Sequence, residues 1–136
     1  MGLYVAGLWR YPVKTLAGEP LTSAEITPNG IPEDRRVWIS GPELVRTARR
    51  YPRLLRLRGT LDGSGRPLID GHAWDSPEAL ALVRDASAAD SRLLAVDGPE
   101  RFDVLPLLVA TDGAVAAFGR DVRRLRPNIL IGGVDG

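Results

Sequence analysis

Cysteine is absent from this chain of 136 residues, and lysine and histidine occur once each, as Lys14 and His72. Without thiols the sequence forms no disulfide and supplies no thiolate nucleophile, iron–sulfur ligand or cysteine-based zinc site. A first-row metal site would have to combine one imidazole with carboxylates, which is a poor donor set for zinc or copper. Because His72 lies in a predicted loop, we expect it to be exposed and not to act as a base.

Long hydrophobic runs are also absent. The first apolar run, Leu3 to Trp9, has seven residues and leads into Arg10 and Lys14. It fits neither the apolar region of a signal peptide nor a membrane-spanning helix, so we expect a cytoplasmic protein. The length and the 44% hydrophobic content predict one domain with a real core. We assign residues 1–131 to that domain and the glycine-rich residues 132–136 to a flexible tail.

Charge of one sign does not dominate, since 18 basic residues face 17 acidic ones and the net charge is +1. General attraction to nucleic acid or anionic membrane is therefore offset, and anion binding must be local. Every basic residue except Lys14 is an arginine. An ammonium is a compact point charge and a guanidinium a planar fork, so they are not interchangeable at an anion site. An arginine-biased genome would also leave one lysine by chance, and composition alone keeps both interpretations open.

The sequence patterns predict several short strands. The run at 3–9 leads into a loop that turns at Pro12 and carries Lys14. An Asn-Gly turn at 28–30 predicts a hairpin, and Gly-Ser-Gly turn chemistry predicts a second one. The hairpin strands are placed at 23–27 with 35–40 and at 55–58 with 67–70, and further strands at 93–96, 104–110 and 128–131. Pro106 indicates that the strand at 104–110 starts late or lies at an edge.

Two short helices complete the predicted fold. Asp75 or Ser76 can cap a helix over 77–86, and Asp112 can cap a helix over 113–118. Together the elements predict a β-rich α+β fold, with a barrel-like, mostly antiparallel sheet and two short helices.

Two clusters of cationic side chains are candidates for chemistry. The loops with Lys14-Thr15 and Asp34-Arg35-Arg36 border predicted strands, so pairing can bring an ammonium, a hydroxyl and a guanidinium together at a phosphate. The alternative is a surface ion pair of Asp34 with a neighbouring arginine and no ligand. In the second cluster, an extended chain would project Arg124 and Arg126 to one side as a two-guanidinium comb. A solvated arginine face is the alternative there.

Four segments carry a family resemblance. They are residues 8–19 (LWRYPVKTLAGE), 30–38 (GIPEDRRVW), 47–52 (TARRYP) and 123–128 (RRLRPN). In this order they resemble the motifs of the MOSC family, the domain found at the C-terminus of molybdenum cofactor sulfurases. The resemblance implies a β-barrel-like domain that holds the molybdenum cofactor, a pterin with a phosphate tail and a dithiolene-bound metal. Family members act in sulfur handling for that cofactor or as molybdenum enzymes that reduce N-hydroxylated compounds.

The resemblance also implies which residues contact the cofactor. Lysine and arginine would donate charge-assisted hydrogen bonds to its phosphate, and asparagine would offer a donor and an acceptor to the pterin (molybdopterin) edge. The positions that match the family motifs are Lys14, Thr15, Arg35, Arg49, Arg124, Arg126 and Asn128.

Three departures from the family pattern modify this expectation. Family members usually continue into a segment whose cysteine binds molybdenum or carries sulfur, whereas this sequence ends at Gly136 without any cysteine. We therefore expect cofactor binding or handling without catalysis by this chain alone. Pro32-Glu33 replace a typical glycine pair, which predicts a changed presentation of Arg35. An unpaired sheet edge near 129–131 would invite a second copy or a partner chain, and a monomer in light scattering at high concentration would contradict this.

Three function classes stay open. The first is a domain that binds or handles the molybdenum cofactor. The second is a molybdenum-dependent oxidoreductase or sulfurtransferase completed by another chain, and molybdenum content separates it from the first. The third is an arginine-rich module for nucleic acid or another anion. It lacks an exposed aromatic platform, because Trp9, Trp38 and Trp74 lie in or beside predicted strands and are expected to serve the core.

Overall fold

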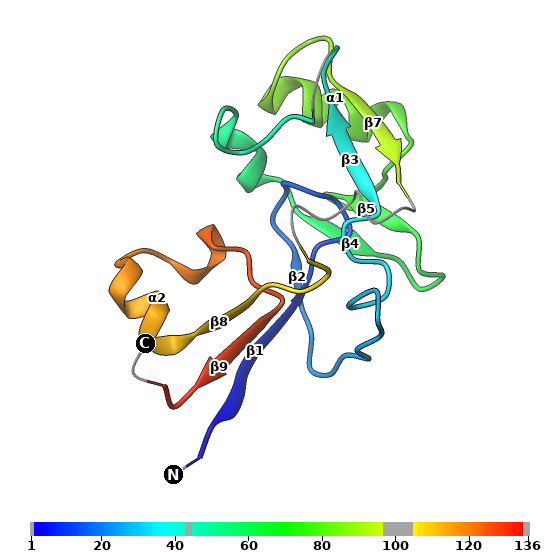
Figure 1. Ribbon diagram of the computed structural model, residues 1–136. Helices are drawn as coiled ribbons and strands as arrows, with labels where there is room; N and C mark the ends of the chain where they lie inside the picture. Colours follow the sequence, from blue (N-terminus) through cyan, green and yellow to red (C-terminus); the bar gives the residue numbers. More distant parts are fainter. Residues whose placement is uncertain (1, 43–44, 97–104, 135–136) are drawn as a thin grey trace.

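The computed structural model describes residues 2–42, 45–96 and 105–134, which form short strands around two α-helices (Figure 1). The strands are β1 (Tyr4–Arg10), β2 (Glu19–Pro20), β3 (Val37–Ser40), β4 (Gly59–Leu61), β5 (Pro67–Ile69), β6 (His72–Ala73), β7 (Arg92–Ala95), β8 (Val109–Thr111) and β9 (Ile129–Gly132). The helices are α1 (Pro77–Ala86), α2 (Asp112–Phe118) and the 3-10 turns η1 (Pro52–Arg56) and η3 (Val122–Arg124).

Within these residues the strands form three sheets, in the orders β2-β1-β9-β8, β3-β7 and β4-β5-β6. Figure 1 shows the four-stranded sheet and α2 in one part of the molecule, with α1 and the other two sheets in the other part. The predicted strand-rich α+β class with two helices is confirmed, and the pairing is antiparallel except between β8 and β9. The described strands do not close into a barrel. They are mostly too short to do so, and single bridges, Val13 to Val37 and Ala17 to Arg58, link the sheets.

The main core lies among β3, η1, β5 and α1. Val37 and Ile39 are buried because alternate residues of a strand face the same side. In α1, Ala79 and Val83 are buried because residues four apart share one helix face. The remaining core residues come from the loop after β1 and from the chain around η1 and β5, namely Val13, Leu16, Leu54, Leu57 and Ile69.

The helix caps agree only partly with prediction. Ser76 accepts a hydrogen bond from Ala79 N at 3.2 Å and caps α1, as one of the two predicted candidates. The cap of α2 is Thr111, whose Oγ1 accepts from Ala114 N at 3.1 Å, and not Asp112 as predicted. No helix in the described part of the chain is both long and apolar enough to span a membrane.

The first predicted hairpin is wrong, although its turn forms. Thr27 and Gly30 exchange backbone hydrogen bonds of 2.9 Å, and Gly30 has the positive φ of 86° expected at an Asn-Gly turn. Residues 23–27 form no strand, and β3 pairs instead with the distant β7. This long-range pairing places Ile39 in the core opposite Leu93, so burial outweighs the local turn signal.

The second hairpin is confirmed as β4 and β5, but its first strand starts at Gly59. The predicted strand at 55–58 is largely replaced by η1, which buries Leu54. The strand predicted at 104–110 begins at Val109 and lies at a sheet edge, as Pro106 indicated, while residue 104 lies outside the described residues.

The predicted unpaired edge near 129–131 is wrong. Strand β9 lies between β1 and β8 and is paired on both sides, so the edges of its sheet are β2 and β8. Association with a second copy or a partner stays a prediction, without the edge that suggested it. The ordered sheet also extends past residue 131, because Gly132 is buried in β9.

Candidate functional site

The loop after β1, residues 11–18, joins the sheets and carries the candidate lysine. Its first six residues, 11–16, are buried. Lys14 N donates to Val37 O at 2.8 Å, which fixes the loop against β3. Ala17 N donates to Leu57 O at 2.9 Å and Gly59 N donates back to Ala17 O at 2.8 Å, which fixes it against the chain between η1 and β4. The motif is therefore a structural joint as well as a candidate site.

Lys14 is only 9% exposed, and its Nζ lies 4.9 Å from the centre of the Trp38 ring. An ammonium over an indole face is attracted by the ring quadrupole. Nε1 of Trp38 is buried and has no hydrogen-bond partner within the described residues. The next residue, Thr15, has a positive φ of 85° and its hydroxyl donates to Arg46 O at 3.2 Å. The loop thus presents an ammonium beside a buried, unsatisfied N–H group.

Arg46 is a residue near this site that sequence analysis missed. Its guanidinium donates to Ser91 Oγ at 3.1 Å, pairs with Asp90 at 2.6 Å and lies 5.4 Å from the Tyr51 ring centre. No sequence motif distinguishes Arg46 from the neighbouring arginines. Its partners Asp90 and Ser91 precede β7 and are brought near only by the pairing of β3 with β7. The predicted Arg49 is exposed on a turn, and no hydrogen bond or ion pair among the described residues connects it to Lys14.

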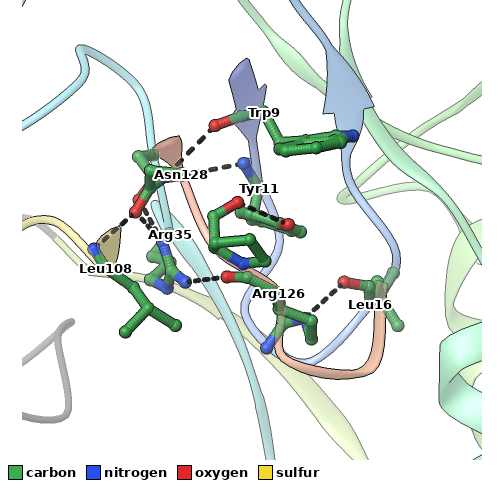
Figure 2. A network of polar contacts seen from close by, with 9 residues as sticks. Trp9, Tyr11, Leu16, Arg35, Leu108, Arg126 and Asn128 are labelled. Atoms are coloured by element: carbon green, nitrogen blue, oxygen red, sulfur yellow. Dashed lines mark hydrogen bonds and ion pairs between the residues drawn. The ribbon is translucent and has the colours of Figure 1, made fainter. Parts of the chain in front are cut away.

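Arg35 and Asn128, which lie 93 positions apart in the sequence, meet in a buried polar network (Figure 2). Arg35 pairs with the fully buried Asp34 and donates to Asn128 Oδ1 at 3.3 Å. Asn128 Oδ1 also accepts from Leu108 N at 3.1 Å, and its Nδ2 donates to Trp9 O at 3.2 Å. The asparagine predicted to read a pterin is thus engaged by β1, by Arg35 and by the chain before β8.

Tyr11 lies at the centre of this network, between two guanidinium groups. Its hydroxyl donates to Pro127 O at 2.8 Å, and its ring centre lies 5.0 Å from Arg35 Cζ and 4.8 Å from Arg126 Cζ. Burial raises the pKa of Tyr11 to about 12, and the positive charges of Arg126 and Arg35 oppose this effect while the Asp34 carboxylate adds to it. Tyr11 is therefore a neutral hydrogen-bond donor at physiological pH.

Arg126 turns inward and Arg124 stays outside. Arg126 has a positive φ of 54°, and its Nε donates to Leu16 O at 3.1 Å, which ties the end of the chain to the lysine loop. Arg124 is exposed at the end of η3 and lines a cleft of about 670 Å³. The predicted comb of Arg124 and Arg126 is wrong, because the segment is a 3-10 turn followed by a left-handed residue and not an extended strand.

The seven predicted residues therefore divide into separate groups. The first group is the lysine loop beside Trp38, the second is the buried network around Tyr11, and two arginines are exposed. The lysine loop holds Lys14 and Thr15, and the buried network holds Arg35, Arg126 and Asn128. The exposed arginines are Arg49 and Arg124.

Comparison with known proteins gives one family. The family model of the MOSC N-terminal beta barrel domain matches residues 2–104, which include the lysine loop and Arg35. No curated protein and no solved structure matches the chain. The arginine-proline-asparagine motif at 126–128 lies beyond the matched residues.

Proposed function

The chain belongs to the MOSC N-terminal beta barrel domain family, and on that premise we propose that it binds or handles the molybdenum cofactor by holding the cofactor's anionic phosphate end. The family supplies the cofactor context, and the lysine loop supplies a chemically suitable anion site. The lysine loop and Trp38 lie within the matched residues 2–104.

The observation that carries the proposal is the contact of the mostly buried Lys14 with the half-buried Trp38. The Nζ of Lys14 lies 4.9 Å from the indole ring centre, and Nε1 of Trp38 is a buried donor with no partner within the described residues. A buried N–H group without an acceptor costs free energy, and a phosphate oxygen would satisfy it once the side chains that cover Nε1 move aside. An ammonium beside that donor supplies the charge-assisted hydrogen bond that phosphate favours.

The buried network is hydrogen-bonded to the lysine loop. Arg35, Arg126 and Asn128 use polar atoms on protein partners, and Arg126 donates directly to Leu16 O in the lysine loop. We assign these three residues a positioning role for Lys14 in place of direct contact with the cofactor. Cofactor contact by Thr15 and by the exposed Arg49 and Arg124 stays a prediction.

The metal end of the cofactor fits this chain less well than the phosphate end. Molybdenum in a dithiolene site favours soft ligands, and this sequence contains no cysteine to supply a thiolate. When bound, the cofactor would supply the redox or sulfur-transfer chemistry of its metal. The residues of this chain would supply charge, orientation and shielding from water at the phosphate.

Pterin and molybdenum content after expression in a host that makes the cofactor tests the proposal. We expect pterin to co-purify with the wild-type protein and to be lost in Lys14→Met, which keeps the apolar stem and removes the charge. Trp38→Phe keeps an aromatic ring but removes Nε1–H, and should reduce the pterin content. Trp74→Phe is the matched control, because Trp74 packs against the hydrophobic core. Pterin retained at the wild-type level in Lys14→Met would show that the proposal is wrong.

A further inference from the structure

A cleft of about 670 Å³ lies where β1, η1 and η3 approach one another. Lys14 is not among its lining residues, so it is distinct from the site proposed above. Its volume is within the range of about 300–1,000 Å³ that is usual for small-molecule sites. The cleft combines an aromatic wall with a cationic rim.

The rim carries three guanidinium groups, from Arg56, Arg58 and Arg124, and one carboxylate, from Asp121. All three arginines are exposed, and none of their side chains takes part in a hydrogen bond or ion pair within the described residues. Elsewhere, arginines are commonly balanced by acids. Arg53, which shares η1 with Arg56, pairs with Asp85 at 3.1 Å, and further ion pairs join Arg10 to Glu19 and Arg66 to Asp75. The rim therefore has excess positive charge.

The wall is formed by Trp9 and Tyr11, whose rings lie against glycine backbone. A Cβ atom added at Gly7 would overlap the Trp9 indole, and one added at Gly18 would overlap the Tyr11 ring. Gly18 itself lines the cleft together with Trp9. In Figure 2 the indole plane of Trp9 extends away from the buried network. Trp9 is therefore half-buried and lines the cleft, and it does not serve only the core as sequence analysis expected.

We propose that this cleft binds a planar heteroaromatic ring that carries a phosphate group, the chemistry of a nucleoside monophosphate. The ring packs against Trp9, since an indole and a nucleobase stack through their π faces. The phosphate lies among the guanidinium groups of Arg56, Arg58 and Arg124, which can offer bidentate, charge-assisted hydrogen bonds. The proposal does not rest on the cofactor function, because neither Lys14 nor Trp38 lines this cleft.

Calorimetric titration of the full chain with guanosine monophosphate tests the proposal. Guanosine lacks the phosphate and ribose 5-phosphate lacks the ring, so both should bind more weakly than the nucleotide. Arg56→Gln and Arg58→Gln should each raise the Kd about tenfold, as loss of a charge-assisted hydrogen bond predicts. Arg53→Gln is the matched control on the same 3-10 turn and should leave the Kd unchanged.

The variants are at exposed positions, so we expect them to fold, and circular dichroism checks this. Added salt should weaken binding of the nucleotide, because it screens the charge contacts at the exposed rim. The proposal is overturned if the nucleotide gives no binding at millimolar concentration, if inorganic phosphate binds as tightly as the nucleotide, or if Arg53→Gln weakens binding as much as Arg56→Gln. Because Lys14 does not line the cleft, either result leaves the cofactor proposal to its own test.

Discussion

Asp34 is buried in the structure, although its sequence context suggests a surface position. As part of an Asp-Arg-Arg run it has the character of a surface charge, yet it is 0% exposed. Its Oδ1 accepts from Tyr11 N at 2.7 Å, and its other oxygen pairs with Arg35. One carboxylate therefore fixes both the start of the lysine loop and the guanidinium that contacts Asn128.

We expect Asp34→Asn to lower the free energy of unfolding by about 3 kcal/mol, because it leaves the Arg35 charge in a mostly buried site without its counter-charge. Urea denaturation measures this. Asp85→Asn is the control, because Asp85 is 82% exposed in its pair with Arg53 and should change stability by less than about 1 kcal/mol. Equal effects of the two substitutions would contradict the buried-pair interpretation.

At the scale of elements, α2 and β9 are joined through Asp112. This residue begins α2, but its carboxylate accepts from Gly133 N at 2.8 Å and Val134 N at 2.9 Å just after β9. Backbone hydrogen bonds from Gly133 and Val134 hold the pKa of Asp112 below its ordinary value. The stabilisation of the folded state by the Asp112 carboxylate is therefore present above the ordinary Asp pKa. It is lost as the pH falls through the lower folded-state pKa of Asp112.

We expect the amide resonances of Gly133 and Val134 to titrate in acid, with a midpoint below 3.8, the ordinary Asp pKa. In Asp112→Ala this titration should vanish and both amides should exchange faster with solvent. NMR spectroscopy measures both effects. Amide shifts with a midpoint at or above the ordinary Asp value would count against the link, as would unchanged exchange in the variant.

At the scale of the molecule, the loop at 11–18, whose first six residues are buried, links the sheets through single bridges. Tyr11 lies where this loop leaves β1 and is 3% exposed, and its hydroxyl donates a hydrogen bond to Pro127 O. The folded-state pKa of Tyr11, about 12, exceeds the ordinary value of 10.0 because of burial. Tyr11 therefore contributes stability that is complete below pH 10 and is lost as the pH rises toward 12.

We expect the unfolding free energy to fall by about 2 to 3 kcal/mol over that alkaline range through Tyr11 ionisation. Tyr11→Phe should be less stable at neutral pH, because it leaves Pro127 O without its donor, but should lack this part of the alkaline loss. The stability difference between the two proteins should accordingly narrow with rising pH. A constant difference from neutral pH to pH 12 would refute the assignment.

Local patterns in the sequence determined the strand-rich α+β class, the family, both helices and the turn at 28–30. These features depend on neighbours in the chain. Alternating apolar residues form strands, Ser76 caps the helix that starts at Pro77, and Asn-Gly adopts a tight turn. The sequence also singled out Lys14 as a candidate, because lysine is rare in this chain and the motif is local, and its role stays a prediction.

Only the tertiary structure decided which strands pair and which cations meet. Burial of Ile39 selects β7 as the partner of β3, and the positive φ of Arg126 turns that side chain into the loop instead of beside Arg124. Arg56 and Arg58 gain their proposed role only because η3 approaches η1 and brings Arg124 to the same cleft. These arrangements depend on contacts between residues far apart in the chain, where packing and charge pairing outweigh local preference, so no local pattern encodes them.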